Sequence, residues 1–177
     1  MKKEEKGKYL PEFVYGAIDG IITTFAVVAG ASGASLSSGI VLILGFANLF
    51  GDGFSMALSN YLSTESAEEL HFRHKHKISG FEKEPKKTAM ATFISFVIVG
   101  FIPLSSFVLA LFFPFIDSNK FLYSTILTAL AFIIVGIIKG VMVGGNKVKS
   151  VLETLIIGEI AAFIAYIVGY LLRGIGG

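Results

Sequence analysis

The chain has 177 residues, of which 54% are hydrophobic and only 16% are charged, and its formal net charge is +2. A soluble domain carries about 25% charged residues, so this composition favours a membrane protein. The absence of cysteine excludes disulfides, zinc–thiolate sites and thiol nucleophiles. The basic residues fall at the ends of apolar segments, which argues against nucleic-acid binding.

Apolar segments long enough to cross a bilayer, which takes roughly 20 helical residues, recur along the chain. We predict five transmembrane helices, over about 11–34, 38–63, 87–113, 121–143 and 151–172. The expected fold class is therefore all-α, a single polytopic membrane domain. Its surroundings are the lipid bilayer.

The first predicted helix begins at Pro11, a residue suited to the first turn of a helix. Asp19 follows Glu12 by seven residues, which is two helical turns, so both carboxylates lie on one face. Thr23 extends this face by one more turn. The first helix thus presents a polar stripe within an apolar span.

The second predicted helix contains a polar, glycine-bearing run at residues 51–60. A carboxylate within a membrane helix costs about 2.5–3.5 kcal/mol, so Asp52 is expected to face a polar cavity or a partner instead of lipid. One face of this helix combines hard oxygen ligands with a soft thioether, at helical spacing: Asn48, Asp52, Met56 (or Ser55) and Ser59. That combination is typical of the wall of a metal site.

The second helix is expected to continue beyond the membrane, because neither Gly nor Pro occurs between residues 54 and 79. We assign 64–86 to a cytosolic helical extension and connection. Its candidate metal-collecting side chains are Glu65, Glu68, Glu69 and His71. The alternative is an ordinary solvated helix face, the commoner meaning of a cluster of charges.

Pro103 predicts a kink in the third helix, because proline disrupts the helical turn that precedes it. The N-terminal tail and the connections at 63–87 and 144–150 hold most of the lysines and arginines. Basic residues favour the cytosolic side. We therefore expect a protein of the cell (inner) membrane with a cytosolic N-terminus and an external C-terminus.

Several stretches, in chain order, resemble the helices of the vacuolar iron transporter family. The run GAIDGIITTF at 16–25 resembles its first helix, and SMAL at 55–58 with YLS at 61–63 resembles its second. Further matching stretches lie at 91–96 and 102–104 for the third helix, and at 152–158 and 165–166 for the fifth. The resemblance covers nearly the whole chain. The short 64–86 connection is similar to that of short prokaryotic-type members, which lack the large cytosolic metal-binding domain.

This resemblance implies a homodimer of five-helix protomers that exports ferrous or manganous ions from the cytosol in exchange for protons. It also implies an ion path near the first helices, at the dimer interface. Asp19 and Met56 match the ion-path residues of the family, and Glu12 matches its cytosolic-side carboxylate.

The function that we expect is transport of Fe²⁺ or Mn²⁺ out of the cytosol. The carboxylates of Asp19 and Asp52 suit hard Mn²⁺, and the thioether of Met56 adds a preference for Fe²⁺. The same carboxylates can take up protons when the metal leaves. No cofactor is expected, and no phosphate-binding glycine loop for ATP occurs in the sequence.

Other functions fit part of this pattern. A small proton-coupled carrier of organic cations needs only a buried carboxylate, but has no specific use for Met56. A non-transporting membrane partner protein is the second alternative, with Asp19 and Asp52 in structural roles, bonded to Ser or Thr hydroxyls. An enzyme is not expected, because all three histidines lie in the stretch after the second span.

Overall fold

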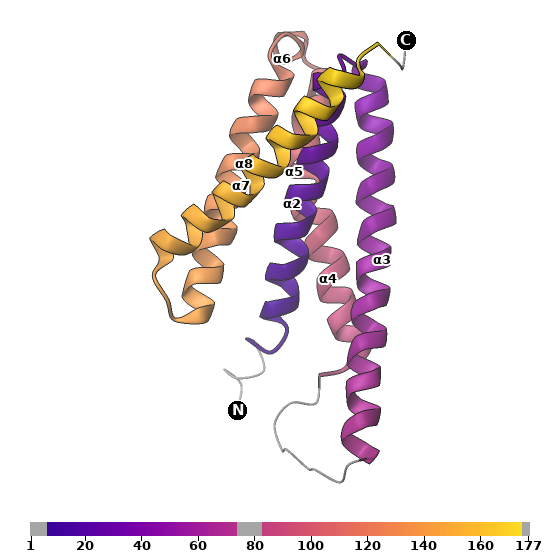
Figure 1. Ribbon diagram of the computed structural model, residues 1–177, viewed down its shortest axis with the longest axis vertical. Helices are drawn as coiled ribbons and strands as arrows, with labels where there is room; N and C mark the ends of the chain where they lie inside the picture. The colour runs from indigo at the N-terminus through magenta and orange to yellow at the C-terminus, as the bar shows by residue number, and fades with distance from the viewer. Residues whose placement is uncertain (1–6, 74–82, 175–177) are drawn as a thin grey trace.

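The computed structural model describes residues 7–73 and 83–174, and within these ranges all the regular elements are helices. The predicted all-α class is confirmed. Figure 1 shows the helices as an elongated bundle. They are α2 (Leu10–Gly33), α3 (Ser38–Arg73), α4 (Pro85–Gly100), α5 (Ile102–Ala110), α6 (Pro114–Asp117), α7 (Lys120–Val143) and α8 (Lys147–Leu172).

Four helices of the described chain, α2, α3, α7 and α8, are each long and apolar enough to cross a membrane. The helices α4 and α5 meet the same criterion together, as one span broken by a bend of 43°. The protein is therefore a polytopic membrane protein with four candidate spans, or five when the bent pair counts as one.

The bend between α4 and α5 lies at Phe101, two residues before Pro103. Pro103 has no N–H to donate to the carbonyl of Val99, and its ring crowds the preceding turn. The predicted kink therefore occurs just before the proline, not at it. The helical part of this span ends at Ala110, three residues before the expected end.

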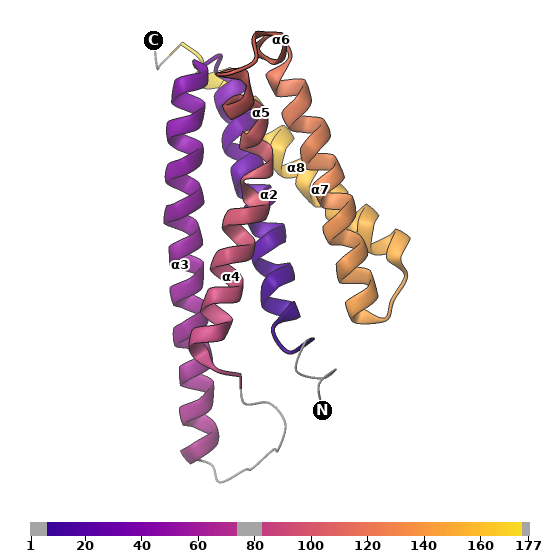
Figure 2. The same cartoon turned by 180° about the vertical axis from the view of Figure 1, so that it is seen from behind.

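Helix α2 is the centre of the bundle. It packs against α3, α4, α5, α7 and α8, and Figures 1 and 2 show it between α3 and α4 on one side and α7 and α8 on the other. Half of the most apolar stretch of α2 is buried inside the protein, whereas only 11% of the corresponding stretch of α8 is buried. A helix so enclosed offers its polar face to protein neighbours and not to lipid.

Glycines allow α4 to approach α2 closely. A Cβ atom added at Gly16 would lie 2.5 Å from the carbonyl oxygen of Thr92, and one added at Gly20 would lie 2.5 Å from that of Phe96. Small residues at helix crossings permit such contacts between membrane helices. The crossing positions α4 against the same part of α2 that carries Glu12 and Asp19.

Helix α3 runs without a break over 36 residues, about 54 Å at 1.5 Å per residue. The hydrocarbon core of a bilayer is about 30 Å thick, so the helix is longer than one crossing requires. Figure 1 shows its far end extending past the start of α4. Residues 74–82 of the connection lie outside the described residues.

Candidate functional site

The structure brings together the two carboxylates predicted within the membrane. Asp19 of α2 and Asp52 of α3 lie close enough to interact electrostatically. Within the described ranges, neither carboxylate has a hydrogen-bond donor or an ion-pair partner, so the hydroxyl bonds of the structural alternative are not observed there. Two facing carboxylates in a membrane call for a cation or protons to balance their charge.

A hydrogen-bonded contact fixes the register of α2 against α3 beside these carboxylates. Thr23 Oγ1 donates to the carbonyl oxygen of Asp19 at 2.9 Å and accepts from Asn48 Nδ2 at 3.4 Å. Asn48 precedes Asp52 by one helical turn on α3. The contact therefore keeps this face of α3 against the polar stripe of α2.

Met56 lies one turn beyond Asp52, on the wall of an open hollow with a volume of about 380 Å³. Tyr15 of α2 contributes to this wall, and the other lining residues come from α3. The lining is Tyr15, Ser55, Met56, Ser59, Asn60 and Ser63. These side chains offer hydroxyls, an amide and a thioether, so the lining of the hollow is part polar and part apolar, and it carries no carboxylate of its own.

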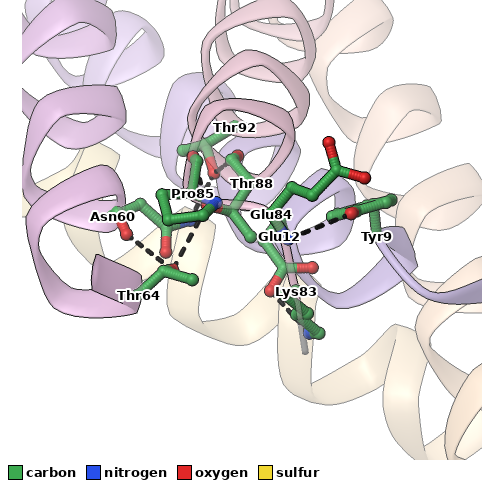
Figure 3. A network of polar contacts seen from close by, with 9 residues as sticks. All are labelled: Tyr9, Glu12, Asn60, Thr64, Lys83, Glu84, Pro85, Thr88 and Thr92. Carbon is green, nitrogen blue, oxygen red and sulfur yellow. Dashed lines mark hydrogen bonds and ion pairs between the residues drawn. The ribbon is translucent and has the colours of Figure 1, made fainter. Parts of the chain in front are cut away.

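Asn60, on the wall of the hollow, is held in place by α4. Its Nδ2 donates to Thr92 Oγ1 at 2.6 Å, and Thr92 Oγ1 donates to the carbonyl oxygen of Thr88 at 3.0 Å. Thr64 Oγ1 lies 3.2 Å from Thr88 Oγ1; Figure 3 shows these four side chains between the two helices. Because the side-chain nitrogen Nδ2 is engaged, the side-chain oxygen Oδ1 of Asn60 is left as a neutral acceptor.

Sequence reasoning did not include Asn60 or Tyr15 among the site residues. Asn60 follows Met56 by one helical turn, which was a signal of a shared face. The hydrogen bond from Asn60 to Thr92 of α4 could not be predicted in this way, because 32 residues separate the two in the sequence.

Glu12 lies two turns before Asp19, in the first turn of α2, a separation of about 10 Å along the helix. Its Oε1 accepts a hydrogen bond from Lys83 Nζ at 2.6 Å. Its Oε2 is buried and has no partner among the described residues. Glu12 is thus on the same helix as the Asp19 site but forms a separate polar centre near one end of the bundle.

Among the described residues, the carboxylates of the α3 extension belong to no group of three potential metal ligands. Glu65 is half-buried and accepts from the hydroxyl of Tyr61 at 3.1 Å, while Glu68 and Glu69 are exposed. The side chain of His71 lies outside the described set. In the part of the chain that is described, no three His, Asp or Glu side chains are placed to share a metal ion, so metal collection here stays a prediction.

Comparison with known proteins identifies one family. A sequence model of the VIT family matches residues 10–77 and 67–170. The vacuolar iron transporter 1 of Tulipa gesneriana is 26% identical, with 88% of this chain and 83% of the relative covered. The vacuolar iron transporter of Toxoplasma gondii is 27% identical, with coverages of 93% and 74%. Vacuolar iron transporter 1 of Arabidopsis thaliana is also 27% identical, with coverages of 90% and 84%.

The alignment with the Tulipa relative spans 210 positions, more than the 177 residues of this chain. That relative therefore carries segments that this chain lacks. The two family matches meet at 67–77, where α3 gives way to the connection. Since the matches together cover nearly the whole chain, the resemblance predicted from its motifs is confirmed, and the chain belongs to the VIT family.

Proposed function

We propose that this protein transports Fe²⁺ and Mn²⁺ out of the cytosol, along a path between α2 and α3, in exchange for protons. The observation that carries the proposal is the pair of facing carboxylates, Asp19 and Asp52, which have no partner among the described residues. Met56 lies one turn beyond Asp52, on the wall of a hollow that is also lined by hydroxyl and amide groups. The relatives named vacuolar iron transporters support iron as a substrate.

The chemistry of this pair suits an exchange mechanism. Two carboxylates balance the charge of one divalent cation, and Met56 adds a soft ligand that favours Fe²⁺ over Ca²⁺ or Mg²⁺. When the metal leaves, protons on the same oxygens restore neutrality. Charge balance with either cargo lets the site alternate between metal and protons, so that the gradients of these ions, and not ATP, drive the exchange.

A second copy of the chain is expected to cover the polar face of α3. Asp52, Ser55, Ser59 and Ser63 are exposed in the single chain although they lie on a candidate membrane span. Polar side chains in a bilayer face protein or a water-filled path instead of lipid. We therefore propose a homodimer in which this face contributes to the ion path, as the family resemblance implies.

We propose the same orientation as from the sequence, because lysines gather at one end of the bundle. The starts of α2 and α4 and the turn from α7 to α8 lie at the same end of the bundle (Figure 1). Lysines at this end include Lys8, Lys83, Lys86, Lys87, Lys147 and Lys149. By the positive-inside rule, we propose that this end is cytosolic, so that metal meets Glu12 before Asp19.

Uptake into proteoliposomes tests the proposal. Vesicles containing the purified protein and a pH-sensitive dye are given Fe²⁺ under reducing conditions, Mn²⁺, or a large organic cation. We expect uptake of both metals, coupled to proton movement in the opposite direction, and none of the organic cation. Transport of the organic cation alone would support the carrier alternative, and no transport of any cargo would support a non-transporting partner protein.

A further inference from the structure

The ion pair between Glu12 and Lys83 joins residues that are far apart in the sequence. The two atoms Lys83 Nζ and Glu12 Oε1 are 2.6 Å apart across a separation of 71 residues. Figure 3 shows Lys83 lying against the carboxylate of Glu12. The contact links the residues just before α4 to the first turn of α2.

This pair differs from the surface pairs of the protein in its burial. The side chains of Glu12 and Lys83 are 12% and 21% exposed, whereas those of the neighbouring pair Glu84 and Lys87 are 60% and 57% exposed. Exposed pairs contribute little because water screens them. A largely buried carboxylate, in contrast, requires a compensating cation.

The backbone that delivers Lys83 is itself attached to α2. The N–H of Glu84 donates to the hydroxyl oxygen of Tyr9 at 3.2 Å (Figure 3). Tyr9 precedes Glu12 in the sequence by about one helical turn. Lys83 therefore extends from a fixed point, and its flexible side chain can leave the carboxylate without moving α4.

Only one of the two carboxylate oxygens of Glu12 is satisfied. Oε1 holds the ammonium group, while Oε2 is buried without a partner among the described residues. A metal ion uses such a carboxylate through one or both oxygens. A divalent ion bound to either oxygen would lie close to the ammonium group of Lys83, and the repulsion between the two cations disfavours their binding at the same time.

We propose that Lys83 is the resident counter-ion of Glu12, which an entering divalent metal must displace. This inference rests on the proposed function, since it assigns Glu12 to the entrance of the ion path. In the absence of metal, Lys83 keeps the buried carboxylate charge-balanced. In its presence, competition from Lys83 weakens metal binding at Glu12, so that the ion passes on to Asp19, about 10 Å further along α2.

The inference is tested with Lys83→Gln, which retains a hydrogen-bond donor for Glu12 and removes only the charge. The matched control is Lys87→Gln, the same change in the exposed neighbouring pair, and Lys83→Arg should restore the parent behaviour. Mn²⁺ binding to the detergent-solubilised protein and Mn²⁺ uptake into proteoliposomes are measured over a range of concentrations. Size-exclusion profiles establish that each variant is folded.

We expect Lys83→Gln to lower the half-saturating Mn²⁺ concentration by about tenfold, the scale of one competing charge-assisted hydrogen bond. Lys87→Gln should leave it unchanged. Adding Glu12→Gln to Lys83→Gln should abolish the gain. An unchanged or higher half-saturating concentration in folded Lys83→Gln would overturn the inference and leave Lys83 as a structural brace.

Failure of the inference and failure of the proposed function give different results. If the parent protein neither binds nor transports Mn²⁺ or Fe²⁺, the proposed function is wrong. If the parent transports metal and Lys83→Gln has the same concentration dependence, only the role of Lys83 is wrong. Should Lys83→Gln fail to fold, Lys83→Met provides the same removal of charge with a side chain of similar length.

Discussion

Replacement of Asp19 by Asn removes one negative charge from the facing pair while keeping the size and polarity of the side chain. Within the described chain, no donor is bonded to this carboxylate, so the substitution breaks no hydrogen bond. Folding should change little, because an amide is also cheaper than a carboxylate inside a membrane. Any large effect on transport must then come from the lost charge.

The magnitude follows from Coulomb's law. One unit charge about 4 Å from another contributes about 4 kcal/mol at an effective dielectric constant of about 20. That energy corresponds to about a thousandfold change in affinity. Asp19→Asn is therefore expected to weaken metal binding by about this factor, and Asp52→Asn should have a comparable effect because the proposed site uses one charge from each carboxylate.

The assay is metal-driven proton movement in proteoliposomes, measured with a pH-sensitive dye at matched protein content. Asp117→Asn is the matched control, since Asp117 forms an exposed pair with Lys120 next to α6 and lies outside the proposed path. We expect Asp117→Asn to behave like the parent, and both path variants to lose proton movement. Parent-like transport by Asp19→Asn and Asp52→Asn would show that these carboxylates are structural and would refute the exchange mechanism.

Four further variants test other parts of the site. Met56→Leu, a close match in volume, should reduce Fe²⁺ uptake more than Mn²⁺ uptake; equal losses would mean that the thioether only packs. Gly20→Ala should lower the free energy of unfolding by about 1–3 kcal/mol, because its Cβ would lie 2.5 Å from the carbonyl oxygen of Phe96, and an unchanged thermal midpoint would contradict the close crossing. Thr92→Val removes the acceptor for Asn60 and should lower the thermal midpoint without changing the total helix content measured by circular dichroism; an unshifted midpoint would mean that this bond adds nothing to stability. Combined alanine substitutions in the extension should raise the half-saturating metal concentration without changing the maximal rate, and an unaltered curve would favour a solvated face; the residues are Glu65, Glu68, Glu69 and His71.

The membrane spans could be predicted from the sequence because hydropathy is a local property. A run of about 20 apolar residues is long enough to cross the bilayer whatever its neighbours are, and the helices found at Leu10–Gly33, Lys120–Val143 and Lys147–Leu172 closely match the expected ranges. The bend before Pro103 is equally local, since it follows from the missing N–H of one residue. The polar stripe that carries Glu12 and Asp19 follows from helical periodicity alone.

Which helix faces each stripe was decided only by the tertiary structure. The meeting of Asp19 with Asp52 depends on how α3 lies against α2, and that register depends on contacts such as the bond from Asn48 to Thr23. Periodicity along one helix contains no information about its partner. The sequence therefore predicted two polar faces, and the packing of α3 on α2 determined that these faces meet.

The pairing of Glu12 with Lys83 shows the same limit more strongly. Periodicity relates residues up to a few turns apart, but this pair is separated by 71 residues. It forms because Gly16 and Gly20 allow α4 to cross close to α2, and because Tyr9 accepts from the backbone of Glu84. The sequence alone identified Glu12 as a candidate ligand. The packing of α4 on α2 placed the ammonium group of Lys83 against its carboxylate.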